Sequence, residues 1–543
     1  MTPERTRFSL LRPAIASTLV VAAPLATAPA FAAEAEQYDE IVVTALGRAT
    51  SLEDSPAAVT VITQSTLERK GVERVEDFVN LVPGMTIVNS AEVADTQVNI
   101  RGISGARDGE INYALVVDGV VITDRSALNR EWNNAAQIEV LKGPQSALYG
   151  RSAAAGAIVI TTKKPQSPFE ADVKASAGEN SAYLLNGRAG GQVNDGLAWQ
   201  VSGTYRDSDG FYENDFTGDD DVIDNFESWA VDGRVLWDPT DNLSLDFKAR
   251  YGEVDAGSIV FNSIFHLPGF TGFGADFYEN VNGNNYRFYS NVDSSNDQES
   301  REFSLRVDYD LGWADVIGWG LYSDIDNSLG SDGTSGAFGF FWGDQDCIDS
   351  TAANTGFPTN PPTYIGADPV FPNSLFGAYT PTTCDGTQWQ ERNQKDYSFE
   401  VRLRSKGDQR LRWEGGLYYL NIEREVGVNL GIDTGAGLVE KLFTTDPRNP
   451  TEQLLRDDFD TDVWAVFGQL SYDITDDLVT DFALRYDKES RDAKSTVPTG
   501  ATTQYLVCTP GDPFTGGDPI NPGLCPNVTN ANSSPSDDWD QLQ

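Results

Sequence analysis

Residues 302–311 of this chain read EFSLRVDYDL and alternate strictly between polar and apolar side chains. Because successive side chains of a β-strand point to opposite faces, the stretch predicts a strand with one apolar and one charged face. Residues 395–404 and 243–251 repeat the pattern. The alternation therefore predicts a protein that is mainly β.

The connections between these strands alternate in length. Residues 239–242 and 407–410 are short connections, whereas residues 252–298 and 326–394 are long. A soluble β-sandwich has a similar alternation of side chains, but short turns on one rim and long loops on the other favour a transmembrane antiparallel β-barrel. Aromatic residues near the strand ends fit the interfacial girdles of such a barrel; they are Trp237, Trp313, Tyr251, Tyr309, Tyr472 and Tyr486.

The composition excludes several classes of protein. With 39 Lys and Arg against 82 Asp and Glu, the formal net charge is −43, so no nucleic-acid partner is expected. The mean hydropathy of −0.36 excludes a bundle of membrane-spanning helices. One His and four Cys leave little for His- or Cys-based chemistry, so we expect no catalytic residue, no metal site and no cofactor.

The first 32 residues have the pattern of a secretory signal peptide. Arg5, Arg7 and Arg12 precede an apolar stretch, which ends in the small-residue cleavage pattern Ala30-Phe31-Ala32. We therefore expect a signal peptide over 1–32 and a location outside the cytoplasm.

Residues 52–165 read differently, as a compact α/β domain. Ser55 to Thr63 is a strand candidate, a helix follows it, and Gly71 is placed to end that helix. Asp118-Gly119 lies between two Val-rich runs and predicts a tight hairpin turn.

The motifs of the N-terminal region resemble the TonB-dependent outer-membrane receptor family. Glu40–Ala45 (EIVVTA) resembles the TonB box of that family, and further motifs follow in the family's order. They are Ser55–Ile62 (SPAAVTVI), Leu81–Gly84 (LVPG), Asn99–Gly102 (NIRG), Leu115–Gly119 (LVVDG), Ile138–Pro144 (IEVLKGP) and Ala147–Lys163 (ALYGRSAAAGAIVITTK). The resemblance implies an α/β plug, residues 52–165, inside a barrel formed from residues 166–543, with a TonB-box segment over 33–51.

The resemblance also implies function and partners. We expect active import of a scarce, bulky nutrient, most commonly an iron-siderophore-type chelate, across the bacterial outer membrane by a monomer. The expected partners are TonB with its ExbB and ExbD complex, which would meet Ile41, Val42, Val43, Thr44 and Ala45, together with outer-membrane lipid, lipopolysaccharide and a small-molecule ligand. Carbohydrate or cobalamin import, a passive channel, and a surface hydrolase or adhesin remain as alternatives.

Candidate ligand contacts lie in a plug loop and in two aromatic clusters of long loops. They are Arg107, Asp108, Phe261, Phe265, Phe270, Phe338, Phe340, Phe341 and Trp342. An even number of cysteines outside the cytoplasm predicts disulfides, most simply within each loop; the cysteines are Cys347, Cys384, Cys508 and Cys525. Arg101 and Lys142 resemble positions that pack the plug against acidic groups of the barrel.

The number of strands predicts a longer natural protein. About eleven strand candidates lie between Phe169 and Glu489, whereas plugged transporters use about 22 strands. We therefore interpret the sequence as the first half of a barrel, with a loop at its C-terminal end.

Overall fold

The computed structural model describes residues 42–44, 50–53, 55, 57–89, 93, 95–106, 109–165, 168–214, 217–258, 290–332, 386–407, 409–431, 433–475, 478–497 and 536–542. The expected signal peptide, residues 1–32, lies outside them. Three sheets and one short hairpin contain the strands of this part of the chain.

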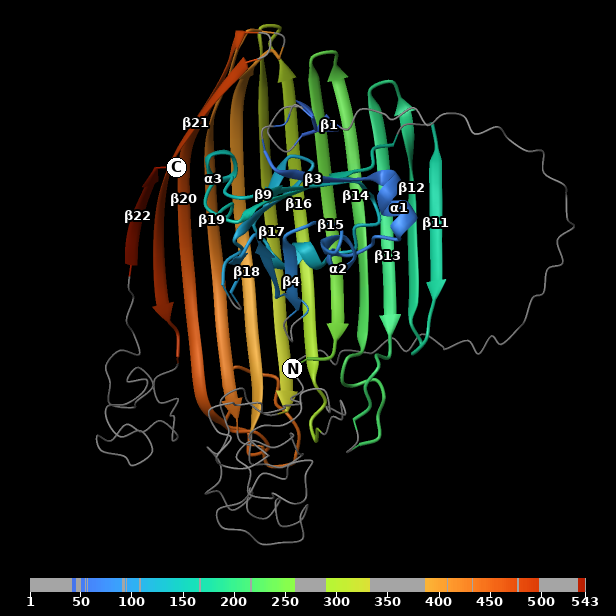
Figure 1. Cartoon of the computed structure of the whole chain (residues 1–543). Helices are drawn as coiled ribbons and strands as arrows, with labels where there is room; N and C mark the ends of the chain where they lie inside the picture. Colours follow the sequence, from blue (N-terminus) through green and yellow to red (C-terminus); the bar gives the residue numbers. More distant parts are fainter. Residues whose placement is uncertain are drawn as a thin grey trace, which may run out of the picture. The chain divides into compact units, whose positions relative to one another are not determined.

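A twelve-stranded antiparallel sheet, here called the large sheet, forms from residues 170–542. Its strands lie side by side in chain order (Figure 1). They are β11 (Glu170–Ala177), β12 (Tyr183–Asn194), β13 (Leu197–Ser208), β14 (Phe226–Thr240), β15 (Leu243–Ala256), β16 (Ser295–Asp310), β17 (Ala314–Asp332), β18 (Thr387–Ser405), β19 (Leu411–Gly431), β20 (Thr451–Thr475), β21 (Leu478–Ser495) and β22 (Ser536–Leu542). The eleven strands expected between Phe169 and Glu489 are present as β11–β21.

The last strand corrects one expectation. Residues 536–542 were expected to form a loop, but they form β22, which pairs with β21 through Tyr486–Asp492. Within the described residues, no pairing joins β22 to β11. The short turns 195–196, 241–242 and 311–313 lie at one end of the large sheet, the upper end in Figure 1, and the described parts of two longer connections, 217–225 and 433–450, lie at the other.

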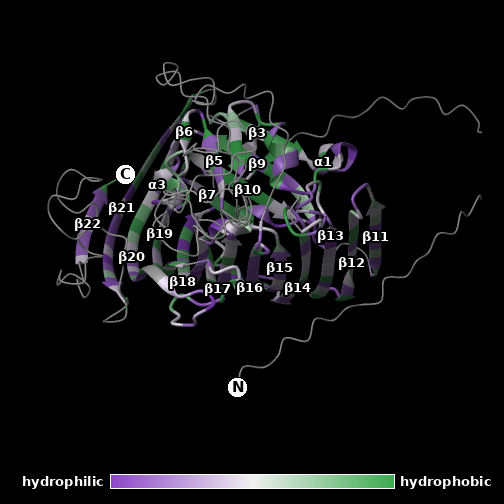
Figure 2. Ribbon diagram, turned by 90° about the horizontal axis from the view of Figure 1, so that it is seen from below, coloured by the Kyte–Doolittle hydropathy of each residue, from purple (hydrophilic) through white to green (hydrophobic). Residues whose placement is uncertain are grey.

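The two faces of the large sheet confirm the predicted alternation. On β18, Phe399 and Val401 are 52% and 54% exposed, whereas Glu400 between them is 3% exposed. An exposed apolar face opposite a buried charged face is the reverse of a soluble sheet and suits contact with lipid. Figure 2, coloured by hydropathy, shows hydrophilic and hydrophobic residues along the strands of the large sheet.

Aromatic rings pack against one another at two places on the large sheet. The ring centroids of Trp313 and Trp413 lie 6.3 Å apart near the short turns. Farther along the strands, those of Tyr419 and Trp464 are 4.4 Å apart. None of the helices in the described part of the chain is both long enough and apolar enough to cross a membrane.

A five-stranded sheet, here called the small sheet, forms from residues 59–162 in the order β3-β9-β10-β7-β8. Its strands are β3 (Val59–Thr63), β7 (Tyr113–Val117), β8 (Val120–Ile122), β9 (Ala135–Lys142) and β10 (Gly156–Thr162). Helices α1 (Gln64–Lys70), α2 (Val75–Val79) and α3 (Ser146–Tyr149), the 3₁₀ helix η1 (Arg125–Asn129), and a sheet of β4 (Met85–Asn89), β5 (Thr96–Ile100) and β6 (Ile103–Ser104) accompany it.

Local sequence signals explain where α1 ends and where the chain turns between β7 and β8. Gly71 ends α1 in the left-handed conformation, with φ of 63°, as expected from the sequence. Asp118 and Gly119 form the turn between β7 and β8 with φ of 50° and 85°, which is the hairpin geometry that Asp-Gly favours.

The small sheet packs against the charged face of the large sheet. Its core is built from fully buried side chains such as Phe78, Leu115 and Ile158. An apolar patch on the large sheet joins this core; its members include Trp319, Leu321, Tyr418, Leu420 and Phe467. The small sheet is therefore held by apolar contact at the patch and, elsewhere, by the charged groups described next.

Candidate functional site

A short strand precedes the small sheet and is docked onto it. β1 (Val42–Val43) pairs antiparallel with β2 (Thr50–Ser51). The Val43 side chain is completely buried and belongs to the core of the small sheet. Burial of a valine side chain contributes roughly 1.5–3 kcal/mol, so this contact anchors the segment.

Two side chains of β9 hold the main chain of this segment. Gln137 Nε2 donates to the carbonyl oxygen of Val42 at 2.9 Å. The Thr44 amide donates to both carboxylate oxygens of Glu139 at 3.1 and 3.0 Å, and its hydroxyl donates to Oε1 at 2.8 Å. Glu139 has no exposed surface. These bonds therefore replace water around a buried carboxylate.

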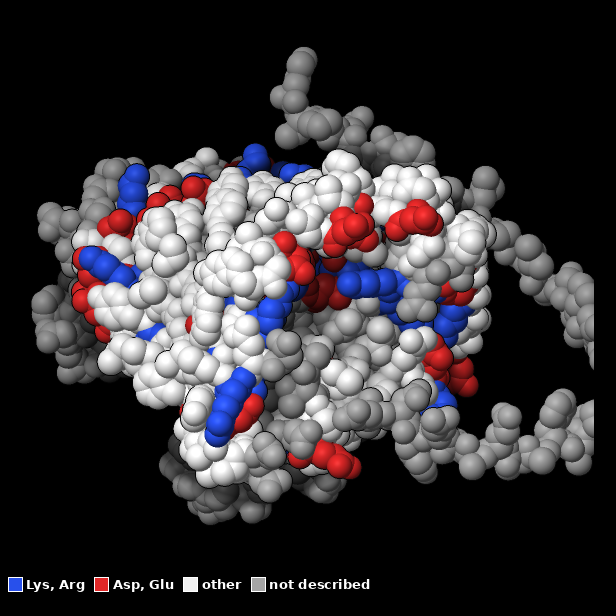
Figure 3. All heavy atoms as spheres, turned by 90° about the horizontal axis from the view of Figure 1, so that it is seen from above, with Lys and Arg blue, Asp and Glu red and all other residues white. Residues whose placement is uncertain are grey.

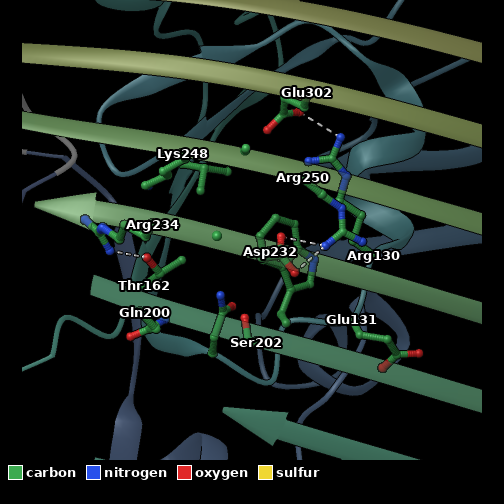
Figure 4. A pocket seen from close by; sticks show the side chains of 15 residues that line it. Arg130, Glu131, Thr162, Gln200, Ser202, Asp232, Arg234, Lys248, Arg250 and Glu302 are labelled. Atoms are coloured by element: carbon green, nitrogen blue, oxygen red, sulfur yellow. Dashed lines mark hydrogen bonds and ion pairs between the residues drawn. The ribbon is translucent and has the colours of Figure 1, made fainter. Parts of the chain in front are cut away.

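The turn between β7 and β8 makes the first set of contacts with the large sheet. Asp118 accepts from the Thr162 amide at 2.9 Å and is ion-paired with Lys248 of β15. Arg234 of β14 donates to the Thr162 hydroxyl at 2.8 Å, as Figure 4 shows. Arg306 of β16 reaches the carbonyl oxygen of Asp118 at 3.3 Å.

The charge of Asp118 is stabilised by this arrangement. Burial acts to raise the pKa of the Asp118 carboxyl, but the cations of Lys248 and Arg234 and the bonds from Lys248 and Thr162 outweigh it, so the pKa lies below its ordinary value. A buried anion with two cations from the large sheet ties the turn to that sheet.

A second link lies at the end of η1. Arg130 donates to Glu302 of β16 at 2.8 Å and contacts Asp124 at 3.3 Å. Burial acts to lower the pKa of the Arg130 guanidinium, but these two carboxylates raise it overall. Beside Arg130, Glu131 pairs with Arg206 of β13 at 3.3 Å.

A cavity of about 70 Å³ lies between these links and the strands of the large sheet (Figure 4). Its lining includes Arg130, Thr162, Asp232, Arg234 and Lys248. A space of this size is large enough for a few water molecules. It is therefore a small gap with a polar lining between the two sheets, and it is too small for a bulky ligand.

The opposite side of the small sheet is tied to β21. Arg151 pairs with Glu489 at 3.0 Å and with Glu110, which also pairs with Arg491. Burial acts to raise the pKa of the Glu110 carboxyl, but the two arginines lower it overall. Thr123 lies between β8 and η1, and its hydroxyl donates to Asp396 of β18.

Charged side chains also gather on the face at the short-turn end. Figure 3, which views this end, shows basic and acidic groups side by side in a central hollow, with further charged groups towards the margins. Mixed charge there is consistent with the ion pairs that join the two sheets.

The structure corrects the expected partners of Arg101 and Lys142. Lys142 donates to the Thr60 hydroxyl at 3.0 Å and to the Pro83 carbonyl at 3.4 Å. Arg101 is exposed and donates to the Lys142 carbonyl at 3.1 Å. These bonds stay within the N-terminal domain, so the expectation that both residues meet acidic groups of the large sheet is wrong.

Most other expected site residues lie outside the described residues. Val42, Val43 and Thr44 are described, whereas Ile41 and Ala45 are not. The expected ligand contacts and cysteines also fall outside: Arg107, Asp108, Phe261, Phe265, Phe270, Phe338, Phe340, Phe341, Trp342, Cys347, Cys384, Cys508 and Cys525. Their roles stay predictions.

Sequence reasoning missed the residues that join the two sheets. Asp118 was recognised only as a turn residue, and Arg130 and Arg151 were not singled out. The charged faces of the strands were the available signal, because a buried charge requires an opposite charge from whatever packs on it.

Comparison with protein families gives two matches along the chain. Residues 51–157 match the family model described as TonB-dependent Receptor Plug Domain. Residues 259–518 match the model described as TonB dependent receptor-like, beta-barrel.

Individual curated proteins match part of this chain. An iron-regulated outer membrane virulence protein of Vibrio cholerae is 34% identical over 226 residues, which is 37% of this chain and 33% of that protein. The ferrioxamine B receptor of Salmonella typhimurium is 30% identical over 239 residues, which is 41% of this chain and 32% of that receptor. This chain spans about a third of the length of these curated relatives.

Solved structures share the fold. The ferric yersiniabactin uptake receptor of Yersinia pestis superimposes with a TM-score of 0.65 at 16% identity, over 90% of this chain and 61% of that receptor. The siderophore receptor of Acinetobacter baumannii gives a TM-score of 0.62 at 15% identity, over 91% of this chain and 62% of that receptor.

Proposed function

This chain belongs to the TonB-dependent receptor family of the outer membrane, and from that premise we propose that it imports a scarce, bulky nutrient driven by TonB. The observation that carries the proposal is the docked segment Val42–Thr44, which lies on the domain that packs into the charged face of the large sheet. The family consists of transporters, which confirms the expectation that the chain is not an enzyme.

We assign an iron-siderophore-type chelate as the ligand. Support comes from the names of the relatives, which include an iron-regulated protein and ferrioxamine receptors. We assign residues 52–165 as the plug, residues 33–51 as the TonB-box segment and residues 166–543 as part of the barrel. ExbB and ExbD supply the energy that TonB transmits.

The proposed cycle uses two kinds of contact. Ligand binding on the long-loop side frees Val42–Thr44 on the short-turn side, and the freed segment adds as a strand to TonB. Force on that strand then moves the plug relative to the large sheet. The ion pairs of Asp118, Arg130 and Arg151 and the polar lining of the cavity permit such movement, because polar contacts can be exchanged for water.

Uptake measurements test this function directly. Replacing Val43 with Pro removes a main-chain donor and the buried side chain from the strand that TonB must pair with. Energy-dependent uptake of iron chelates should fall to the level of a TonB-deficient strain, while the amount of receptor in the outer membrane stays unchanged. Val42→Ala, which keeps the main-chain donor at an exposed position, is the matched control and should retain most uptake.

The same experiment separates the alternatives. A passive channel would conduct solute equally well with and without TonB, and with Val43→Pro. Uptake of a carbohydrate or of cobalamin in place of an iron chelate would keep the TonB mechanism and change the ligand. Iron-chelate uptake that is the same in the wild type and in Val43→Pro would contradict the role of the segment.

A further inference from the structure

The edge of β1 that faces β9 presents two main-chain groups, the carbonyl of Val42 and the amide of Thr44. In a β-strand, the main-chain groups of alternate residues point to the same edge. Both groups are occupied by side chains: Gln137 Nε2 lies 2.9 Å from the Val42 oxygen, and the Thr44 nitrogen lies 3.1 and 3.0 Å from the carboxylate oxygens of Glu139. Val42 and Val43 also pair with β2.

Gln137 and Glu139 are two residues apart on β9, so their side chains leave the same face of the small sheet. One supplies an N–H donor and the other supplies acceptor oxygens. A neighbouring β-strand would offer these same two kinds of group to Val42 and Thr44. Gln137 Nε2 also donates to Glu139 Oε1 at 2.9 Å, which fixes the two side chains relative to each other.

We propose that Gln137 and Glu139 form a clasp that imitates the strand edge of TonB, and that the clasp and TonB compete for the same main-chain groups. This inference rests on the proposed function and names the residues that regulate it. The Thr44 amide has a single proton, so its bond to Glu139 must break before it can donate to a partner strand.

Glu139 contributes more to the clasp than Gln137 does. Its carboxylate accepts from the amide and from the hydroxyl of Thr44, and hydrogen bonds to a charged acceptor are stronger than those between neutral groups. Burial of Val43 in the core of the small sheet keeps Val42 and Thr44 in register with the two side chains. Loss of the Glu139 charge should therefore release the segment while the small sheet stays folded.

The test uses the full chain in outer-membrane vesicles without ligand. In Glu139→Gln, hydrogen–deuterium exchange of peptides that contain residues 42–44 should accelerate. The apparent affinity for the periplasmic domain of TonB should rise by on the order of tenfold, because the apparent Kd is the intrinsic Kd divided by the fraction of chains with a free segment. Gln137→Ala removes the donor to Val42 and the bond from Gln137 to Glu139. It leaves the Glu139 carboxylate to accept from Thr44, so both readouts should change in the same direction by less.

A matched control is available on α1. Glu68 is a carboxylate that pairs with Lys163 at 3.1 Å, and Glu68→Gln should leave both readouts unchanged. If Glu139→Gln fails to fold, Thr44→Val carries the test, because it removes the 2.8 Å hydroxyl bond and leaves β9 intact.

The two readouts separate this inference from the proposed function. Faster exchange in Glu139→Gln without TonB binding by any variant supports docking by the clasp and rejects the TonB-driven function. Normal TonB binding by the wild type, together with unchanged exchange in both Glu139→Gln and Thr44→Val, overturns the clasp.

Discussion

Single residues set the closest approaches within the small sheet. Gly156 begins β10 with φ of 155°, and a Cβ built on it would lie 2.1 Å from the carbonyl oxygen of Leu141. That oxygen belongs to the main chain of β9, so it cannot move aside without disturbing the pairing of the two strands. Position 156 therefore requires glycine for two reasons: a Cβ would collide with the Leu141 carbonyl, and the backbone has a positive φ.

We expect Gly156→Ala to lower the free energy of unfolding by about 3 kcal/mol or more, because overpacking and backbone strain add. Gly71→Ala is the matched control. Gly71 also has a positive φ, 63°, but nothing lies within 4 Å of its added Cβ, so the loss should be about 1 kcal/mol. Denaturant unfolding in detergent measures both. Equal losses would show that the contact with Leu141 is unimportant.

A second residue, Asp118, predicts a pH dependence. Its pKa is lowered in the folded protein, so its ion pairs stabilise the protein above the ordinary value of 3.8, and this stabilisation is lost as the pH falls through the lowered pKa. Asp118→Asn should destabilise by about 3 kcal/mol at pH 7, because cations from the large sheet lose a buried partner.

The difference between wild type and Asp118→Asn should therefore shrink below pH 3.8 and persist between pH 5 and pH 7. Thermal unfolding across this range measures it. A difference that is constant down to the lowest pH would mean that the Asp118 charge does not link the two sheets. Glu68→Gln, at an exposed pair with Lys163, should show little difference at any pH.

Sequence alone did not reveal how individual charges pair. Arg101 and Lys142 were expected to meet the barrel, but their bonds stay within the N-terminal domain. Gln137 and Glu139 gave no local signal, because the run that contains them reads as an ordinary strand and their partner Val42–Thr44 is distant in sequence. Pairings of this kind depend on tertiary placement, which a periodic pattern does not encode.

Elements were predicted more successfully than contacts. The turn at Asp118-Gly119 and the end of α1 at Gly71 follow from backbone preferences of single residues. β11–β21 follow from alternation, because each must present one face to lipid. β22 was missed because all seven of its residues are exposed, and it lacks an apolar face; it exists by pairing along β21.

The contact between Thr123 and Asp396 of β18 allows a test of whether the plug moves relative to the large sheet. Thr123→Cys with Asp396→Cys, joined by a short bifunctional reagent, would tie the plug to the large sheet where the Thr123 hydroxyl now donates to Asp396. We expect uptake to be lost and TonB binding to be retained. Each single cysteine variant treated with the same reagent is the control and should keep its uptake. Undiminished uptake in the linked protein would mean that transport needs no movement at this contact.

The whole molecule has an inverted distribution of polarity. Large apolar side chains such as Leu417 and Trp464 are 64% and 62% exposed on the large sheet, whereas Arg485 and Glu400 are buried on its other face. The alternating sequence predicted both faces. It did not predict that the apolar patch around Tyr418 would interrupt the charged face, because a patch formed from several strands is visible only once their register is known.

The docking of β1 also constrains the order in which the chain folds. Thr44 and Glu139 are separated by 95 residues, and closing so long a loop costs more conformational entropy than forming the local turns between them. The contact requires β9, which itself pairs with both β3 and β10. Docking is thus a late, high-contact-order step. Protection of residues 42–44 would therefore report that the small sheet is already assembled, and in a nascent or misfolded chain we expect these residues to stay exposed.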